Sequence, residues 1–214
     1  MVTRGAAWLL LAGFAAGCAG GSGERGMVSI PPPRGWEDDL ARDRSQRERW
    51  IRTDPDSPLP ADARPGFDGL EFWGPAPDYY FVGDVQAYAR PERFEIVTTS
   101  GQVRPCERVG WISFAVGGRP LRLQVYRLLD SSDQDDLFLP FKDETSGGET
   151  YPAGRYVKLV GDGSGPWVLD FNRAFNPSCA YGSPERFACP VTPAENRLPV
   201  RIEAGERGFR EPAS

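Results

Sequence analysis

The sequence predicts a mainly β fold, a single antiparallel β-barrel or sandwich domain with one N-terminal amphipathic helix. Three observations lead to this fold class. Short segments from residue 79 onward alternate apolar and polar side chains, two pairs of them are joined by glycine-containing turns, and only one segment has helical periodicity. With 214 residues, 40% of them hydrophobic, the chain is long enough for one domain with a buried core.

The predicted helix covers residues 35–52, GWEDDLARDRSQRERWIR. Trp36, Leu40 and Trp50 recur at helical spacing among charged residues, and acidic residues occupy the first turn, where the helix dipole favours them. We expect this helix to pack its two tryptophans against the domain rather than to bind a partner. The proline-rich stretch at residues 53–78 then predicts an extended connector.

The best hairpin candidate is the run VGWISFAVGGRPLRLQVYRL. A two-residue turn at Gly117-Gly118 places Ile112 opposite Leu123, so that one face of the hairpin is apolar and the other is polar. This alternation is typical of an antiparallel sheet with one buried face.

A second hairpin candidate is the run GRYVKLVGDGSGPWVLDFN. A turn at residues 162–164 would pair Leu159 with Trp167 across the two strands. The alternating pattern near the C-terminus predicts a final strand at residues 198–204.

The N-terminus predicts export and lipidation. Residues 1–17 combine a positive start at Arg4, a short apolar run and small residues at the end, as a signal peptide does. The cysteine at position 18 directly follows Ala15-Ala16-Gly17, which resembles the lipobox of bacterial lipoproteins. That resemblance implies cleavage before Cys18 and acylation of this residue. Ordinary secretion with an incidental Cys18 is the alternative.

The predicted anchor divides the chain into three parts. After the signal peptide, residues 18–33 are rich in Gly, Ser and Pro and predict a flexible tether, and residues 34–210 form the single β-rich domain. The domain would lie outside the cytoplasm, anchored to a bacterial membrane. In a Gram-negative host, Ala19 after the cysteine resembles the pattern of lipoproteins on the periplasmic side of the outer membrane.

Residue composition excludes several classes of function. The chain has no histidine, so it can contain neither a Ser-His-Asp or Cys-His relay nor an imidazole zinc site. It also lacks the glycine motifs that bind nucleotide phosphates or dinucleotides, and we expect no cofactor. The net charge of -5 and the lack of a basic stripe argue against a nucleic-acid partner. The acidic run at residues 130–136 lacks the spacing of an EF-hand, so we expect a solvated loop and no metal.

The other three cysteines leave two interpretations open. Cys179 and Cys189 are close enough in sequence to close a small loop, and an extracytoplasmic location permits a disulfide, which would leave Cys106 as a buried thiol. The competing interpretation makes Cys179 a reactive thiol beside Arg173, although the chain supplies no histidine to act as its base.

Carboxylates offer another possible chemistry, because glycosidases use two carboxyl groups at a set separation. Asp143 and Asp170 are among the candidates. Arg155 alternates with Val157 along its strand and should therefore face the apolar side. A buried arginine is costly unless it is paired, so we expect a carboxylate partner, with a ligand anion as the alternative.

Three runs, LFLPFKDETSGGETYPAGRYVKL, VLDFNRAFNPSCAY and CPVTPAENRLPVRIEAGE, resemble the domain-of-unknown-function family numbered 1684. With motifs nearer the N-terminus, the resemblance covers most of residues 36–206. The family has no assigned activity. The resemblance implies a β-rich single domain and a set of polar residues that includes Ser146, Cys179 and Glu206. From this set we take as candidate ligand-binding residues Asp143, Thr145, Thr150, Tyr151, Arg155, Asp170, Asn172, Asn176, Glu195 and Asn196.

These observations predict a noncatalytic β domain of the cell envelope that binds a small molecule, a glycan or a protein. A carboxylate-based hydrolase and a thiol enzyme centred on Cys179 are the alternatives. The expected partners are the membrane, through the lipid anchor, and an unknown small ligand or envelope protein. The run DFNRAFNPSCAY, residues 170–181, would be either part of a polar pocket or an architectural segment whose side chains satisfy buried backbone groups.

Overall fold

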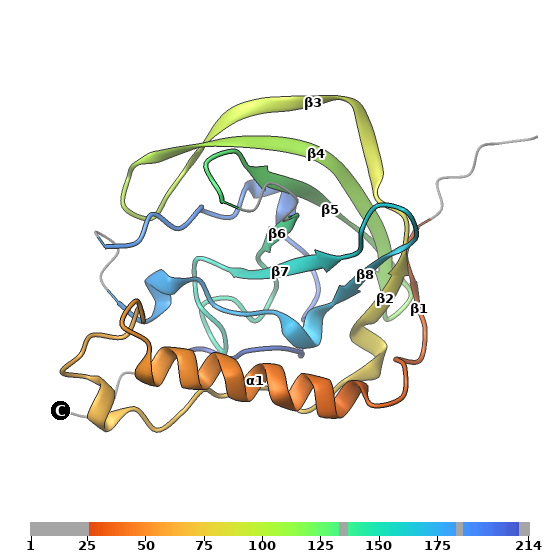
Figure 1. Ribbon diagram of the computed structural model, residues 1–214. Helices are drawn as coiled ribbons and strands as arrows, with labels where there is room; N and C mark the ends of the chain where they lie inside the picture. The colour runs from red at the N-terminus through yellow and green to blue at the C-terminus, as the bar shows by residue number, and fades with distance from the viewer. Residues whose placement is uncertain (1–25, 133–136, 183–185, 210–214) are drawn as a thin grey trace, which may run out of the picture.

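A computed structural model of the protein describes residues 26–132, 137–182 and 186–209. Within these residues, eight β-strands and one α-helix form the fold (Figure 1). The strands are β1 (Val28–Ser29), β2 (Tyr80–Gly83), β3 (Gln86–Val97), β4 (Val103–Val116), β5 (Arg119–Leu128), β6 (Phe138–Phe141), β7 (Arg155–Val160) and β8 (Trp167–Asp170). The α-helix is α1 (Trp36–Thr53), and the connections contain the short 3-10 helices η1 (Arg64–Gly66), η2 (Pro77–Tyr79), η3 (Phe171–Arg173), η4 (Ser178–Ala180) and η5 (Ala194–Asn196).

All eight strands of the described residues belong to one antiparallel sheet, in the order β1-β2-β8-β7-β6-β5-β4-β3. The sheet is strongly curled into a half-barrel, and α1 runs along one side of it (Figure 1). This arrangement confirms the predicted mainly β fold with a single N-terminal helix.

The main core lies inside the curl of the sheet. In the β4–β5 hairpin, Ile112 pairs with Leu123 and Phe114 pairs with Leu121, as the glycine turn predicts, and all four side chains are buried. Residues outside the central strands complete this core: Met27, Phe171, Ala174, Leu198, Ile202 and Ala204.

The second predicted hairpin forms from β7 and β8, but its register differs from the prediction. Leu159 pairs with Leu169 rather than with Trp167, because the connection spans residues 161–166 instead of a tight turn. A shift of two residues keeps every side chain on the face it would otherwise occupy. Leu159 and Leu169 therefore still enter the core.

The predicted final strand at residues 198–204 is not a strand. Leu198, Ile202 and Ala204 are buried and Val200 is partly buried, as the alternating pattern suggests. However, the carbonyl groups of Ile202 and Ala204 accept hydrogen bonds from the guanidinium group of Arg155 rather than from a neighbouring strand. The segment completes the core without extending the sheet.

Helix α1 matches its predicted limits to within one residue at each end. Trp36 and Leu40 pack against Tyr80 of β2, as expected for the first tryptophan. Near the C-terminal end of the helix, Ile51 enters a second cluster, and Trp50 packs against that cluster while remaining only partly buried.

The fold begins earlier than residue 34, where we expected it to start. Met27 is 4% exposed within the main core, and β1 pairs with β2. The backbone N–H of Met27 also donates to the carbonyl of Ser113 in β4 at 2.6 Å. This bond links the residue just before β1 to a strand near the opposite edge of the curled sheet. Apolar residues at positions 27, 28 and 30 interrupt the Gly/Ser-rich composition of the predicted tether, and they explain the difference.

The predicted signal peptide at residues 1–17, the lipidation site Cys18 and residues 19–25 lie outside the described residues. Among the residues that are described, no helix is both long enough and apolar enough to span a membrane.

Candidate functional site

Arg155, at the start of β7, is the centre of a buried polar cluster. Its side chain is 0% exposed, and its Nη2 atom lies 3.5 Å from Oδ2 of Asp143. The guanidinium group also donates to the backbone carbonyls of Ile202, Ala204 and Glu206. Burial lowers the pKa of Arg155 to about 10, while Asp143 opposes this shift, so the group is charged at neutral pH. The expected carboxylate partner of Arg155 is therefore confirmed.

Asp143 is held in place by the loop that follows it. The Thr145 hydroxyl lies 2.8 Å and 2.9 Å from the two carboxylate oxygens, and the Ser146 hydroxyl donates at 3.2 Å. The backbone N–H of Ile202 donates to Oδ2 at 2.7 Å, and the hydroxyls of Thr145 and Thr150 are 3.0 Å apart. These hydrogen bonds hold the Asp143 carboxylate in place beside Arg155.

Asp170 and Asn172 connect the run at residues 170–181 to the N-terminal part of the chain. The indole Nε1 of Trp36 donates to Oδ2 of Asp170 at 2.7 Å, and the backbone N–H of Asn172 donates to Oδ1 at 3.0 Å. The Asn172 side chain accepts from the N–H of Ala76 at 2.8 Å and donates to its carbonyl at 2.9 Å. Burial raises the pKa of Asp170, and the hydrogen bonds from Trp36 and Asn172 act in the opposite direction.

Asn176 and Glu206 form a second junction, which includes α1. The Asn176 side-chain amide donates to Oε1 of Glu206 at 3.0 Å, and Nε of Arg47 donates to Oε2 at 2.8 Å. Glu206 is 1% exposed, and burial raises its pKa while Arg47 opposes the shift. This carboxylate joins the helix to the C-terminal segment.

Asn196 connects β5, β6 and η5. It accepts from the backbone N–H of Gln124 at 2.8 Å and donates to the carbonyls of Gln124 and Pro140 at 3.0 Å and 2.8 Å. The adjacent Glu195 is exposed and pairs with Arg108 at 2.6 Å. Asn196 thus acts as a bridge between backbone segments.

The predicted disulfide between Cys179 and Cys189 is present, with 6.4 Å between the Cα atoms. The Tyr151 hydroxyl donates to the carbonyl of Cys179 at 3.3 Å. Cys106 is the free cysteine of the described residues, and burial raises the pKa of its thiol to about 11. Because Cys179 is bridged, it has no thiol group to act as a nucleophile.

Most of the predicted ligand-binding residues therefore bind other parts of the protein. Tyr151 is partly buried and Glu195 is exposed. The remaining eight are buried and hydrogen-bonded within the protein: Asp143, Thr145, Thr150, Arg155, Asp170, Asn172, Asn176 and Asn196. For the polar side chains within residues 170–181, these contacts favour the architectural interpretation, because they fix non-regular backbone to α1 and to the C-terminal segment.

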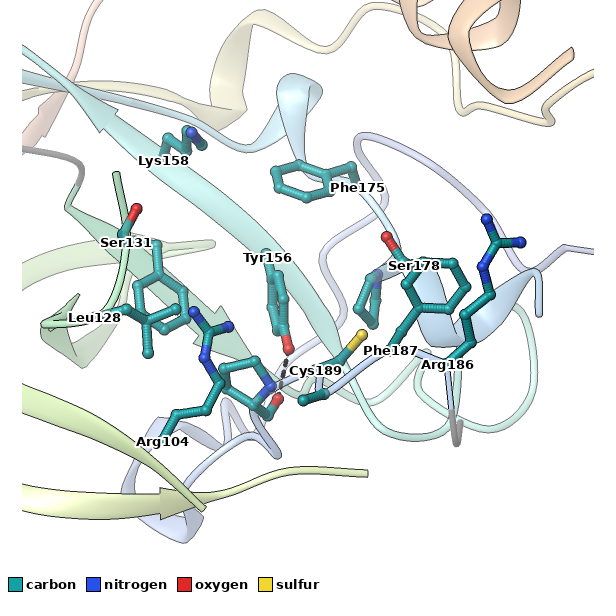
Figure 2. A pocket seen from close by; sticks show the side chains of 14 residues that line it. Arg104, Leu128, Ser131, Tyr156, Lys158, Phe175, Ser178, Arg186, Phe187 and Cys189 are labelled. Carbon is teal, nitrogen blue, oxygen red and sulfur yellow. Dashed lines mark hydrogen bonds between the residues drawn. The ribbon is translucent and has the colours of Figure 1, made fainter. Parts of the chain in front are cut away.

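A pocket of about 410 Å³ lies elsewhere, beside the outward-facing side chains of β7. In Figure 2, Tyr156 stands near its middle, with Lys158 and Phe175 above and Phe187 to one side. Small-molecule sites commonly have volumes of roughly 300–1,000 Å³. The pocket is lined by Arg104, Leu128, Ser131, Phe138, Tyr156, Lys158, Phe175, Pro177, Ser178, Arg186, Phe187, Ala188, Cys189 and Pro190.

Aromatic rings form much of the pocket wall. The ring centroids of Phe138 and Tyr156 are 5.7 Å apart, those of Tyr156 and Phe175 are 6.0 Å apart, and both pairs meet edge to face. The Tyr156 hydroxyl donates to the carbonyl of Pro190 (Figure 2). Burial raises the pKa of Tyr156, so the phenol remains neutral and keeps this donor.

Three cationic residues, Arg104, Lys158 and Arg186, also line the pocket, and no acidic residue is among the described residues that do so. The cations come from β4, β7 and the segment that precedes Cys189. Asp130 holds Arg104 in a bidentate pair, with distances of 2.9 Å and 2.7 Å. The pocket therefore combines apolar walls with positive charge.

None of the ten predicted ligand-binding residues lines this pocket; Asn172 lines a smaller one, of about 140 Å³, beside α1. One local signal could have found the larger pocket, because Tyr156 and Lys158 alternate with the buried residues of β7 and so share its outer face. Phe175, Pro177 and Ser178 of the run at residues 170–181 also line the pocket, so part of that run does contribute to a cavity. The segment at residues 186–190, which closes the pocket on another side, carries no sequence pattern that predicts its position.

Within the described ranges, no group of three or more Cys, Asp or Glu side chains could hold a metal ion. The acidic run at residues 130–136, expected to be a solvated loop, lies partly outside them, since residues 133–136 are not described.

Comparison with known proteins agrees with the resemblance seen in the sequence. The family model described as "Protein of unknown function (DUF1684)" matches residues 65–207. The chain belongs to this family. A solved structure is also similar: the solution NMR structure of the uncharacterized protein from gene locus rrnAC0354 of Haloarcula marismortui, with 34% sequence identity and a TM-score of 0.61. The similarity covers 80% of this chain and 94% of that one. The comparison with curated proteins gives no match.

Proposed function

We propose that this protein is a noncatalytic β domain of the cell envelope, anchored through lipid on Cys18, that binds a small molecule in the pocket around Tyr156. The observation that carries the proposal is the pocket itself. It has the volume of a ligand site, aromatic walls and three cations, while the predicted polar residues are bonded to the protein.

The walls of the pocket are held by rigid parts of the fold. Tyr156 lies in β7, between β6 and β8, and its backbone exchanges two hydrogen bonds of 2.9 Å with Phe175. On the other side, the disulfide fixes Cys189, beside the pocket residue Phe187. Such preorganisation lowers the entropy that a site loses when it binds a ligand.

The proposed location is supported by the sequence of the N-terminus and by the disulfide. Residues 1–17 have the features of a signal peptide, and Cys18 follows a lipobox-like run. Disulfides persist in oxidising compartments outside the cytoplasm. The location and the ligand site are separate parts of the proposal, because either can be tested without the other.

The two enzymatic alternatives have no favouring observation. Asp143, Asp170 and Glu206 are each 3% exposed or less and are hydrogen-bonded to protein groups, so they are poorly placed to act on a substrate. A thiol mechanism needs a free Cys179, which the bridge to Cys189 removes.

A thermal-shift screen of the purified protein tests the proposed site. The panel contains sugars, nucleotides, flavins, fatty acids and divalent metals. A ligand at a hundred times its dissociation constant stabilises the folded state by about 2.7 kcal/mol, which corresponds to a rise in melting temperature of roughly 5–10 °C for a domain of this size. We expect at least one organic compound to produce such a shift.

Two variants, in each of which one alanine is replaced by phenylalanine, provide a test of the pocket and its matched control. Ala188→Phe places a ring in the pocket, whereas Ala194→Phe places one at an exposed position in η5 that does not line it. With both variants shown by circular dichroism to be folded, the shift should be lost in Ala188→Phe and kept in Ala194→Phe. The proposal fails if no compound shifts the wild type, or if Ala188→Phe responds as strongly as the wild type.

A further inference from the structure

We infer that the ligand of this pocket is an amphiphilic anion, a carboxylate or phosphate group carried on an apolar body. The inference rests on the proposed function and goes beyond it by naming the class of ligand. It follows from three properties of the pocket: the sign of its charges, the nature of its walls and the surface that continues from it along β7.

The charges around the pocket favour an anion. Arg104, Lys158 and Arg186 come from three different parts of the chain and meet at one cavity. Arg104 is oriented by its bidentate pair with Asp130, which uses Nε and Nη2 as donors and leaves Nη1 outside the pair. No acidic residue is among the described lining residues. Asp130 offsets part of the charge of Arg104 from outside the lining, and the cations of the pocket favour an anionic group over a cationic one.

The walls favour an apolar body rather than a compact ion. The rings of Phe138, Tyr156 and Phe175 follow one another edge to face, and Phe187 lines another part of the cavity. The Tyr156 hydroxyl, which could otherwise bind a polar ligand, already donates to a backbone carbonyl. These rings therefore offer apolar contacts to the body of a ligand.

The apolar surface continues beyond the cavity. Tyr156, Lys158 and Val160 lie on one face of β7, and Val160 is 59% exposed. Val160 pairs with Val168 of β8, which pairs with Val82 of β2, and these two valines are partly buried against the cluster that includes Trp36 of α1. An extended apolar chain could therefore place its anionic end beside Lys158, with Tyr156 on one side of the lysine and Val160 on the other.

Calorimetric titration with matched amphiphiles tests the inference. The probes are dodecanoate, dodecyl phosphate, dodecanol and dodecyltrimethylammonium, each as a monomer in solution, together with acetate and inorganic phosphate. We expect the two anionic chains to bind at least about tenfold more tightly than dodecanol, the effect of roughly one charge-assisted hydrogen bond. Acetate and inorganic phosphate should not bind measurably, since they lack the apolar body.

The two lysines of the chain give a matched pair of variants. Lys158→Gln removes a cation of the pocket, whereas Lys142→Gln removes one that does not line it. Dodecanoate should bind about tenfold more weakly to Lys158→Gln. It should bind equally well to Lys142→Gln and the wild type, and dodecanol should not distinguish the three proteins.

Several results would overturn the inference. If dodecanol or the cationic amphiphile binds as tightly as dodecanoate, charge does not select the ligand; if acetate or phosphate does so, the apolar body is irrelevant. If only a neutral compound from the thermal-shift panel binds, and Ala188→Phe abolishes its binding, the ligand class is wrong while the proposed site stands. If no compound binds to the pocket at all, the proposed function fails as well.

Discussion

Replacing Arg155 by methionine removes a guanidinium group from the interior while keeping much of the side chain's bulk. Asp143, whose side chain is 0% exposed, then loses its cation, and the carbonyls of Ile202, Ala204 and Glu206 lose a donor. Removing one partner of a buried ion pair costs about 3–5 kcal/mol. At roughly 2–4 °C per kcal/mol for a domain of this size, the melting temperature should fall by roughly 6–20 °C.

Urea unfolding followed by tryptophan fluorescence and far-UV circular dichroism measures this loss. Arg197→Met, a change at an exposed position, serves as the control and should alter stability by no more than about 0.5 kcal/mol. The double variant Arg155→Met/Asp143→Asn should regain part of the stability, because it no longer buries an unpaired charge. If Arg155→Met unfolds like the wild type, the ion pair does not support the fold and the reasoning is refuted.

Three further predictions concern a buried acid and the cysteines. Burial raises the folded-state pKa of Asp170, so its contribution to stability is complete below about pH 4 and is lost as the pH rises through that raised pKa. Urea titrations between about pH 4 and pH 8 give the unfolding free energy of the wild type and of Asp170→Asn. The wild-type value minus the Asp170→Asn value should fall as the pH rises, and a constant difference would contradict this. Reducing the Cys179–Cys189 bridge should lower the free energy of unfolding by about 3 kcal/mol, and an unchanged melting temperature after verified reduction and alkylation would refute the estimate. In cells, Cys18→Ser should abolish labelling by radioactive fatty acid and move the protein from the membrane pellet to the soluble fraction, whereas a variant that still sediments with membranes would exclude this anchor.

The regular parts of the fold could be predicted because local patterns decide them. In the β4–β5 hairpin, alternation and a glycine turn fix which residues face each other, so Ile112 and Leu123 pair as expected. For β7 and β8 the same pattern predicts the buried faces but not the register. A six-residue connection and a three-residue turn place the same side chains inside, and only packing across the sheet selects between them.

The non-regular parts could be predicted only as a set of polar residues. The residues taken from the family motifs are indeed unusual, but their partners are backbone groups far away in sequence. Asn172 bonds to Ala76, and Arg155 bonds to carbonyls about 50 residues later. Side chains that satisfy buried backbone are the same residue types that line polar ligand sites, so the sequence does not distinguish the two roles.

The pocket could not be predicted, because it depends on how distant segments meet. Tyr156 and Lys158 are visible as the outer face of a strand, but Arg104 and Phe187 are brought beside them only by the curl of the sheet and by the disulfide-bridged segment. The aromatic and cationic residues involved are common on protein surfaces, and their convergence is a property of the tertiary structure alone.

The proposed function depends on whether a ligand binds in the pocket around Tyr156. Titration of isotopically labelled protein with dodecanoate, followed by NMR chemical shifts, tests it most directly. We expect saturable shifts that are largest at Tyr156, Lys158, Phe175 and Phe187, with little change in the buried cluster around Arg155. Shifts that are absent, or that are largest away from these pocket residues, would contradict it.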